Sequence, residues 1–191
     1  MQVNDYASRF WELLECEHQR ARAYCLRLVG NTDDGDDVYQ DAIMKAYRGF
    51  AALRDTAVFR PWLYRIINNT YRDRFASPWW RRVLAGVYDL ESAAGGEDPS
   101  HQYDARRRVA YALDALSAEE RILVTLAELE GWKISELAGL LTTNEAVVKM
   151  RLSRARGKMR ERLLKLGRKR GVTLMNGEIE QLCCATKPEK D

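Results

Sequence analysis

The chain has 191 residues, of which 46% are hydrophobic and 31% are charged, a composition that suits a folded globular protein. It has no apolar run near the roughly 18 residues of a membrane span, and its start, MQVNDYASRF, lacks the basic-then-apolar profile of a signal peptide, so we expect a cytoplasmic protein without membrane insertion. Its four cysteines show no CxxC spacing, so neither a zinc site nor a disulfide framework is indicated, and we expect no metal and no cofactor.

The net charge of +3 hides an uneven distribution of charge. Residues 142–170 hold eleven lysines and arginines against two glutamates, a local balance of +9, so the rest of the chain sums to −6. A cationic segment on a mildly acidic body favours a polyanionic partner for that segment alone.

Few stretches alternate in the manner of strands, so the fold class that we predict is all-α. Apolar residues return at helical spacing over residues 5–29, up to Gly30, and again over residues 34–50. Cys16 and Cys25 in the first helix are expected to be small core residues. The second helix turns a largely polar stripe toward the outside, formed by Asp37, Gln40, Asp41, Met44 and Lys45. Spacing alone does not distinguish this stripe from ordinary solvated surface.

A short connector, Phe50–Val58, leads into a third predicted helix, Phe59–Phe75. Its core side can be formed by Trp62, Leu63, Ile66 and Thr70. Its outer faces carry cations, aromatic rings and amides: Arg60, Tyr64, Arg65, Asn68, Tyr71, Arg72 and Arg74. This mixture suits unpaired nucleic acid, because bases stack on rings while arginine follows phosphate. The aromatic residues could equally be core residues of a small helical bundle, and the sequence leaves both interpretations open.

Residues 77–103 contain a Gly-Gly pair and become acidic, which indicates a flexible interdomain linker. Trp79 and Trp80 are expected to dock on a domain or a partner, since two exposed tryptophans are unfavourable on a free linker. Residues 171–191 are interpreted as a tail. A metal- or redox-sensing role for its adjacent cysteines, Cys183 and Cys184, is a hypothesis that thiol titration with and without oxidant would test.

The second domain, residues 104–170, contains a predicted helix-turn-helix, KISELAGLLTTNEAVVKMRLSRARGKMRERL. Ser117 with Glu120 has the spacing of a capping box at the start of an earlier helix. Thr142 with Glu145 has the same spacing at the start of the second helix of the motif. The chain is therefore expected to form two small helical domains, an N-terminal bundle and this C-terminal domain, joined by the linker.

The second helix of this motif has two contrasting sides. A buried stripe is predicted for Val148, Leu152, Ala155, Met159 and Leu163. The opposite side has mostly small residues at its centre and cations at its edges: Ala146, Met150, Ser153 and Gly157, flanked by Lys149 and Arg154. Such a helix can lie close to the floor of a major groove while lysine and arginine reach bases and phosphates. The alternative is a surface helix with a solvated basic face.

Three stretches in this order resemble a bacterial sigma factor of the extracytoplasmic-function (ECF) group: DDVYQDAIMKAYRGF, FRPWLYRIINNTYRDRF and, after the linker, LDALSAEERILVTLAELEGWKISELAGLLTTNEAVVKMRLSRARGKMRERL. The resemblance covers about residues 8–76 and 104–165. It implies that residues 1–76 are sigma region 2, which binds core RNA polymerase and recognises and melts the −10 element. It implies that residues 104–170 are region 4, which recognises the −35 element. An anti-sigma factor is a further partner that the resemblance implies.

The resemblance also assigns candidate contact residues. Core polymerase binding maps onto Asp37, Gln40, Asp41 and Lys45. Recognition of −10 DNA, as duplex and as melted strand, maps onto Arg54, Arg60, Trp62, Tyr64, Arg65, Asn68, Asn69, Tyr71 and Arg72. Recognition of −35 DNA maps onto Asn144, Glu145, Lys149, Met150, Arg151, Ser153, Arg154, Arg156 and Lys158. The family usually has a polar residue at the position of Met150, and a methionine there could contact a thymine methyl group.

Two other classes of function are alternatives. A conventional repressor or activator that binds duplex DNA without polymerase would explain the helix-turn-helix, but it would leave the arginine- and aromatic-rich helix without a role. An enzyme acting on DNA would need a nucleophile in a basic cluster, or convergent carboxylates for a metal. The N-terminal block offers neither, because its acids lie in the Asp33–Asp41 run at a helix start and His18 is isolated. We therefore expect no enzymatic activity.

Overall fold

The computed structural model describes residues 2–75 and 108–169, and within these ranges the chain forms helices and turns without a strand. The all-α prediction is therefore confirmed for this part of the protein. The chain divides into two compact units, Met1–Ala76 and Ser77–Asp191. Two predicted segments lie outside the described residues: the linker 77–103 with Trp79 and Trp80, and the tail 171–191 with Cys183 and Cys184.

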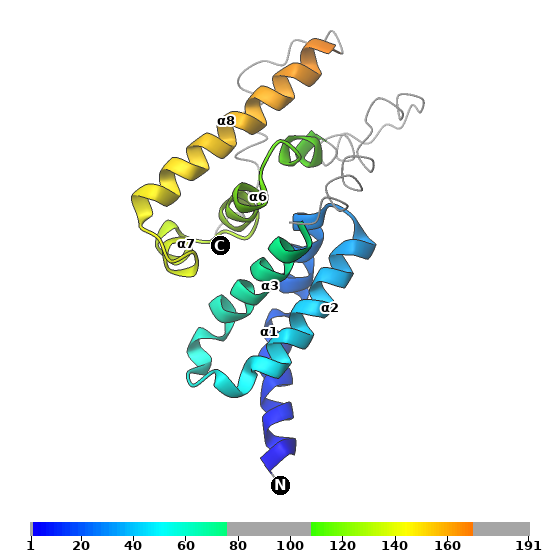
Figure 1. Ribbon diagram of the computed structural model, residues 1–191, viewed down its shortest axis with the longest axis vertical. Coiled ribbons are helices and arrows are strands. Elements are labelled where there is room, and N and C mark those ends of the chain that lie inside the picture. Colours follow the sequence, from blue (N-terminus) through cyan, green and yellow to red (C-terminus); the bar gives the residue numbers. More distant parts are fainter. Residues whose placement is uncertain (1, 76–107, 170–191) are drawn as a thin grey trace, which may run out of the picture. The chain divides into compact units, whose positions relative to one another are not determined.

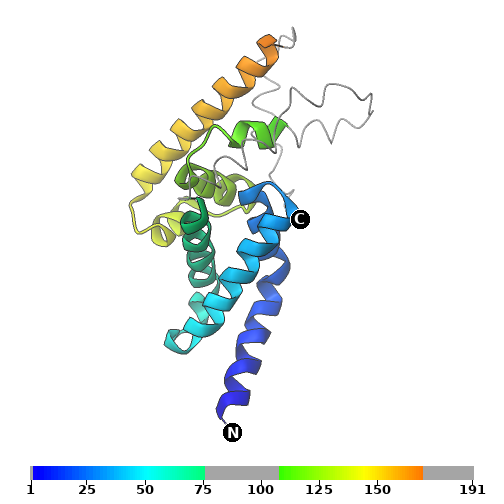
Figure 2. The ribbon, with the colours of Figure 1, turned by 45° about the vertical axis from the view of Figure 1, so that its right-hand side comes forward.

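Three helices form the first unit, and each runs back along the one before it (Figure 1): α1 (Gln2–Val29), α2 (Thr32–Gly49) and α3 (Phe59–Phe75). Two short 3-10 turns, η1 (Phe50–Ala52) and η2 (Thr56–Val58), connect α2 to α3. α2 packs against both α1 and α3, and α1 also contacts α3, an arrangement seen from a second side in Figure 2. The three helices therefore share one core.

The helix ends follow from local chain chemistry. Gly30, at φ 92°, ends α1 in the left-handed region that glycine tolerates. Asn31 caps α2, because its Oδ1 accepts the Asp34 N–H at 2.9 Å. Pro61 lies in the first turn of α3, where its missing N–H costs no helical hydrogen bond. The three helices predicted for this unit are confirmed, with ends that differ by a few residues.

Aromatic rings fill part of the core and fix the connector between α2 and α3. The Phe10 ring meets four others edge to face, with centroids 5.3 to 6.0 Å away: Trp11, Tyr47, Phe50 and Phe59. Trp62 adds its ring to the cluster, 6.3 Å from Phe50 and 5.8 Å from Phe59. Full burial of one such phenylalanine contributes about 1.5–3 kcal/mol, so this cluster holds the first turn of α3 on the bundle.

The two cysteines of α1 differ in their environment. Both lie in the helix, as predicted, but only Cys25 is buried, and Cys16 is exposed. The prediction that Cys16 is a core residue is therefore wrong. Helix phase explains the difference: nine positions at about 100° each amount to two and a half revolutions, which places the two side chains on opposite sides of α1.

Close packing between α1 and α2 depends on a glycine. A Cβ added at Gly35 would lie 2.6 Å from the Leu26 Cδ2 and 2.8 Å from the Leu26 Cα. Beside this contact, Arg22 Nε and Nη2 donate to the two Asp36 oxygens at 2.6 and 2.7 Å. The hydrogen bond from Arg22 lowers the pKa of the Asp36 carboxyl from its usual value. α1 and α2 are thus held together by the close approach of their backbones at Gly35 and Leu26 and by the bidentate ion pair of Arg22 with Asp36.

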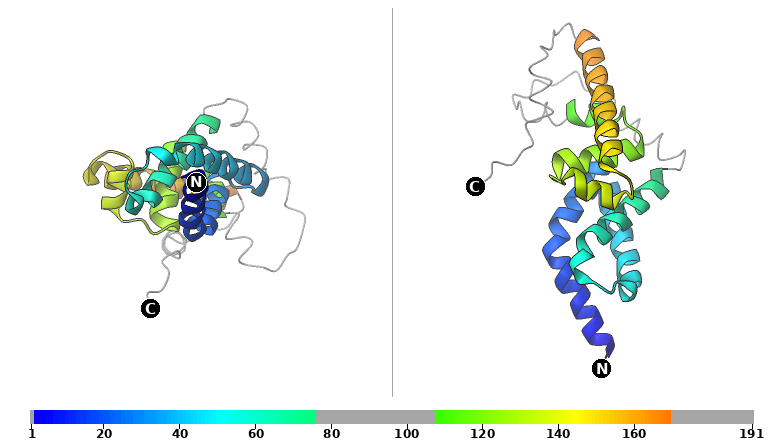
Figure 3. Two further views of the ribbon diagram at one scale, coloured as in Figure 1. Left: turned by 90° about the horizontal axis from the view of Figure 1, so that it is seen from below. Right: turned by 90° about the vertical axis from the view of Figure 1, so that its left-hand side faces the viewer.

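The second unit contains a helical segment at 108–113, α6 (Ala118–Val124), a π-helical turn η3 (Thr125–Leu129), α7 (Ile134–Leu140) and α8 (Glu145–Lys169). α6 and α7 pack on α8, which the right-hand view of Figure 3 shows as one long helix that reaches beyond them. The capping box of Ser117 and Glu120 is confirmed: the Glu120 N–H donates to Ser117 Oγ at 3.3 Å, and the Ser117 N–H donates to Glu120 Oε2 at 3.0 Å.

α8 buries the stripe that its sequence predicts: Val148, Leu152, Ala155, Met159 and Leu163. Two arginines connect the 108–113 segment to the rest of the unit. The buried Arg121 of α6 pairs with Asp114 at 2.5 Å. The Arg162 guanidinium of α8 lies 4.3 Å from the centroid of the Tyr111 ring. These contacts hold residues 111–114 against α6 and α8.

The turn between α7 and α8 differs from its prediction. Thr142 has φ 52°, a left-handed conformation, and it belongs to the end of α7. The cap of α8 is Asn144, whose Oδ1 accepts the Val147 N–H at 2.9 Å. The predicted capping box of Thr142 and Glu145 is therefore wrong. Asn144 lies directly before the first residue of α8, where a cap must lie, and Thr142 lies too far upstream.

Replacing Gly35 by alanine should destabilise the first unit by about 2 kcal/mol, because a methyl group cannot fit against the Leu26 backbone unless α1 moves away from α2. Urea unfolding followed by circular dichroism would measure the loss. Gly49→Ala is the matched control, since its new Cβ would make an ordinary contact at 3.6 Å with the Trp62 ring. Equal unfolding midpoints for the two variants would contradict the close-packing argument.

Replacing Thr142 by glycine should stabilise the second unit by about 1 kcal/mol, because threonine is strained at positive φ. The turn itself is retained by backbone bonds from the Thr142 and Thr143 N–H groups to the carbonyls of Gly139 and Ala138, at 3.4 and 2.9 Å. Thermal unfolding would measure the gain. Thr143→Gly, one residue later, should bring no such gain; a higher melting temperature for this control than for Thr142→Gly would refute the strain at Thr142.

Candidate nucleic-acid interface

The exposed side of α8 carries the residues that the sequence places in a groove. Its centre is formed by four exposed residues, all within about 60° of one another around the helix: Ala146, Met150, Ser153 and Gly157. Lys149 and Arg154 are also exposed and flank this centre, one on each side. Because most side chains at this centre are short, the helix can approach a polyanion closely between the two cations, as a major-groove contact requires.

Two of the predicted −35 contacts are paired within the domain. Arg156 forms an ion pair with Glu128 of η3, and Lys158 Nζ donates to Glu120 of α6 at 2.7 and 2.8 Å. Partial burial raises the pKa of the Glu120 carboxyl, but hydrogen bonds from Lys158 and Ser117 outweigh it and hold this pKa below its usual value. Both cations expose about half of their side chains, so they can contact phosphate only by sharing or leaving these carboxylates.

The remaining predicted −35 residues differ in what they can offer. The Asn144 side chain is committed to the backbone of the first turn of α8. Glu145 lies 3.9 Å from the Lys149 Nζ, a loose surface pair that contributes little in water. Arg151 and Arg154 are exposed. Lys149 and Arg154 are therefore the cations best placed to reach base edges.

α3 buries three of the residues predicted to face −10 DNA. Tyr64, Asn68 and Tyr71 expose 1% or less of their surface, so their placement on the outer face is wrong. The Tyr24 hydroxyl donates to Asn68 Oδ1 at 2.6 Å, and the Tyr24 and Tyr64 rings lie 5.1 Å apart. Because α3 contacts both α1 and α2, roughly half of its circumference is covered. For these three residues the core interpretation, which the sequence left open, is the correct one.

Arg60 lies on a different side of α3 from the other predicted −10 arginines. Its Nε is 3.7 Å from Glu17 Oε2 of α1, and its guanidinium is 5.8 Å from the centroid of the Tyr64 ring. Five positions separate it from Arg65, which is about 140° around the helix. The structure therefore does not bring Arg60 together with Arg65 and Arg72.

Arg65, Asn69 and Arg72 line the outer side of α3 at successive turns. Arg72 Nη1 donates to Asn69 Oδ1 at 2.8 Å. Trp62 is half-buried one turn before Arg65, and Arg54 is exposed on the connector. Guanidinium groups, an amide and the edge of an indole ring are the groups that contact phosphates and unpaired bases.

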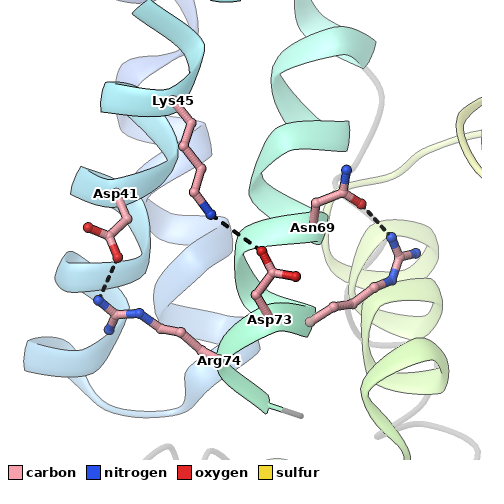
Figure 4. A network of polar contacts seen from close by, with 6 residues as sticks. Asp41, Lys45, Asn69, Asp73 and Arg74 are labelled. Carbon is pink, nitrogen blue, oxygen red and sulfur yellow. Dashed lines mark hydrogen bonds and ion pairs between the residues drawn. The ribbon is translucent and has the colours of Figure 1, made fainter. Parts of the chain in front are cut away.

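The predicted polymerase-binding stripe of α2 is tied to the last turn of α3. Arg74 Nη2 donates to Asp41 Oδ2 at 2.7 Å, and Arg74 Nη1 lies 3.5 Å from Asp37 Oδ2. Lys45 Nζ reaches Asp73 Oδ2 at 3.4 Å. Figure 4 shows Arg74 pointing to Asp41 and Asp73 pointing to Lys45, two contacts that cross between the helices. Three of the four predicted residues are therefore already paired within the protein.

An exposed apolar patch lies beside this stripe: the sequence places Met44 on the outside of α2, but it does not predict that Tyr47 and Trp11 join it. Gln40 is exposed, and Met44, one turn further along α2, is 53% exposed. Tyr47 stacks on Trp11 of α1, with ring centroids 6.1 Å apart, and Trp11 is 53% exposed. The sequence does carry a signal for this patch, since Trp11 lies one position after Phe10 and a turn of about 100° takes it off the buried stripe. Exposed apolar side chains gathered beside charged ones are typical of a protein-binding surface.

Within residues 2–75 and 108–169, no group of three His, Cys, Asp or Glu side chains lies close enough to hold a metal ion. No helix in that part of the chain combines the length and the hydropathy needed to cross a membrane.

Comparisons with known proteins match both halves of the chain. The family Sigma-70 region 2 matches residues 13–81, and the family Sigma-70, region 4 matches residues 106–159. The ECF RNA polymerase sigma factor SigM of Mycobacterium tuberculosis is 33% identical over 144 residues, which cover 74% of this chain and 71% of SigM. The RNA polymerase sigma factor NccH of Alcaligenes xylosoxydans xylosoxydans is 32% identical over 165 residues, 83% of this chain and 87% of NccH.

Two solved structures share the fold. CnrH, in complex with the cytosolic domain of CnrY, matches with a TM-score of 0.57 and 27% identity over 80% of this chain and 85% of CnrH. The sigma factor RpoE of Bartonella quintana, in complex with the anti-sigma factor NepR, matches with a TM-score of 0.54 and 23% identity over 84% of this chain and 97% of RpoE.

Sigma region 2 followed by sigma region 4 on an all-helical chain is the arrangement of the sigma-70 class of transcription initiation factors. Within that class, the chain belongs to the extracytoplasmic-function group of RNA polymerase sigma factors. The resemblance seen in the sequence is therefore confirmed.

Proposed function

We propose that this sigma factor joins core RNA polymerase through α2, directs it to the −35 element through α8 and opens the −10 element with α3. The observation that carries the proposal is the two-sided character of α8. Its buried stripe fixes it against α6 and α7, and its other side presents three small residues and Met150 between Lys149 and Arg154. This is the geometry of a recognition helix in a major groove.

In this proposal residues 1–76 act as region 2, residues 77–103 link the regions and residues 104–170 act as region 4. The −10 contacts are reduced to the exposed and half-buried members of the sequence-predicted set, without Arg60, which lies on another side of α3: Arg54, Trp62, Arg65, Asn69 and Arg72. The three buried members of that set serve the core instead. The polymerase surface consists of the α2 stripe together with the apolar patch beside it: Asp37, Gln40, Asp41 and Lys45, with Met44, Tyr47 and Trp11.

The −35 contacts divide into two groups by their position on α8. Base edges would be met by Lys149, Met150, Ser153 and Arg154. Phosphates would be met by Arg151, Arg156 and Lys158, the last two after exchange of their intramolecular carboxylates. Asn144 and Glu145 lie at the amino end of the helix, where Asn144 sets its start.

We further propose that the protein acts in the cytoplasm, beside the polymerase, and performs no catalysis of its own. An anti-sigma factor is part of the proposal, since both solved relatives are in complex with a second protein. For RpoE that protein is an anti-sigma factor.

Run-off transcription with purified core RNA polymerase on a library of promoter fragments should give transcripts that depend on this protein and share −35 and −10 elements. Asp41→Arg should abolish most of that transcription, because a cation replaces a carboxylate on the stripe of α2. Glu15→Arg, which makes the same charge change on the exposed side of α1, should transcribe like the wild type. Folded protein that binds duplex DNA alone and does not stimulate polymerase would instead identify a conventional regulator, and wild-type activity of Asp41→Arg would exclude the α2 stripe.

Arg154→Ala or Lys149→Ala should weaken promoter binding by about 1–3 kcal/mol, because a contact to base edges is lost. Binding of holoenzyme to promoters with matched and altered −35 elements would measure both affinity and selectivity. Lys165→Ala removes a cation from the same helix two or more turns later and should leave selectivity unchanged. Unchanged −35 selectivity in both Arg154→Ala and Lys149→Ala would refute the groove assignment.

A further inference from the structure

We propose that the last turn of α3 partly covers the polymerase-binding stripe of α2 in the free protein. Arg74 then binds the carboxylates that a cationic side chain of core polymerase binds in the complex. This inference rests on the proposed function. It concerns which side chains contact the α2 stripe before core polymerase binds. The turn contributes both charges of the contact: Arg74 to the carboxylates of α2 and Asp73 to Lys45.

The geometry of Arg74 is that of a side chain filling a two-carboxylate site. Asp37 and Asp41 are one turn apart on α2, so their carboxylates face the same way, and the two Nη atoms of Arg74 lie 3.5 and 2.7 Å from them. The Arg74 side chain is 24% exposed, whereas Asp37 and Asp41 are 62% and 48% exposed. Arg74 is therefore the more covered partner, and about half or more of each carboxylate side chain stays open to a partner. Figure 4 shows the Arg74 contact to Asp41.

Charge complementarity identifies the kind of partner that fits. All charged residues of α2 up to Asp41 are acidic: Asp33, Asp34, Asp36, Asp37 and Asp41. Asp36 is already paired with Arg22 on the opposite flank. A complementary partner surface would therefore place an arginine or lysine against the open carboxylates of Asp37 and Asp41. It would place an acidic group against Lys45 and apolar side chains against Met44. A guanidinium from the partner would take over the bidentate role that Arg74 now has.

The exchange would link two functional surfaces of region 2. Arg72 and Asn69, which belong to the proposed −10 contacts, share their last turns of helix with Asp73 and Arg74. When the partner's cation displaces Arg74, the end of α3 loses its hold on α2. The −10 surface is then changed by polymerase binding itself, through the one stretch of helix that carries both sets of residues.

Competition between Arg74 and the partner predicts a gain of affinity when Arg74 is removed. A partly exposed ion pair is closed most of the time but is weak, so its removal should tighten core binding by about two- to five-fold. Equilibrium binding of fluorescently labelled protein to purified core RNA polymerase, without DNA, measures this directly. Arg74→Gln should show the gain, Asp73→Asn a smaller one, and Arg20→Gln, which removes the same charge from the exposed side of α1, none.

A double-mutant cycle assigns the gain to the carboxylate. Asp41→Asn should weaken core binding, and adding Arg74→Gln to it should bring much less improvement than in the wild type. An Arg74→Gln protein that binds core as the wild type does, or more weakly, with its helicity and melting temperature retained, would overturn the proposal, because Arg74 would then orient the stripe and not fill it.

A second variant covers the case in which Arg74→Gln does not fold. Asp73→Asn removes only a surface contact of 3.4 Å, and tighter core binding by this variant supports the proposal while unchanged binding overturns it. Wild-type protein that fails to bind core at all would overturn the proposed polymerase function and this inference together. Wild-type binding with no gain in either variant would overturn this inference alone.

Discussion

The share of each helix's circumference that its neighbours cover decides which side chains can act outside the fold. α3 contacts both α1 and α2 and loses roughly half of its surface to the core, including two tyrosines and an asparagine. α8 is packed by α6 and α7 and keeps its basic side exposed. Both helices mix apolar and cationic residues at helical spacing, yet α3 presents a narrow polar face and α8 presents a broad one. Every interface proposed for this protein consists of side chains that helix packing leaves at least partly exposed.

This constraint also explains how much the sequence could predict. Periodicity gives the phase of a helix, so the buried stripe of α8 and the exposed stripe of α2 were predicted residue by residue. Periodicity does not give the width of the buried side, because that depends on how many neighbours a helix has. Tyr64, Asn68 and Tyr71 were misplaced for this reason. The cap of α8 was misplaced because Thr142 and Asn144 both offer a side-chain oxygen near the helix start, and spacing alone does not choose between them.

Contacts between distant residues were the least accessible to sequence reasoning. Arg74 and Asp41 are 33 positions apart, and Arg156 and Glu128 are 28 apart. Only the packing of α2 on α3, and of α8 on the helices before it, brings these charges together. In both units a surface proposed for a partner is partly neutralised by the protein's own opposite charges. Such surfaces exchange an intramolecular pair for an intermolecular one, which favours selectivity over raw affinity.

The pairing of Arg156 and Lys158 with Glu128 and Glu120 has a consequence for how region 4 searches for DNA. Non-specific affinity for duplex DNA comes from counterions that leave the phosphates, with a salt exponent of about −0.9 for each phosphate neutralised. Two cations that are already balanced by acids release fewer counterions on contact. We therefore expect the domain to bind random DNA more weakly, and with less salt dependence, than the +9 balance of residues 142–170 suggests. The two glutamates would then shorten its stay at sites other than promoters without contacting DNA themselves.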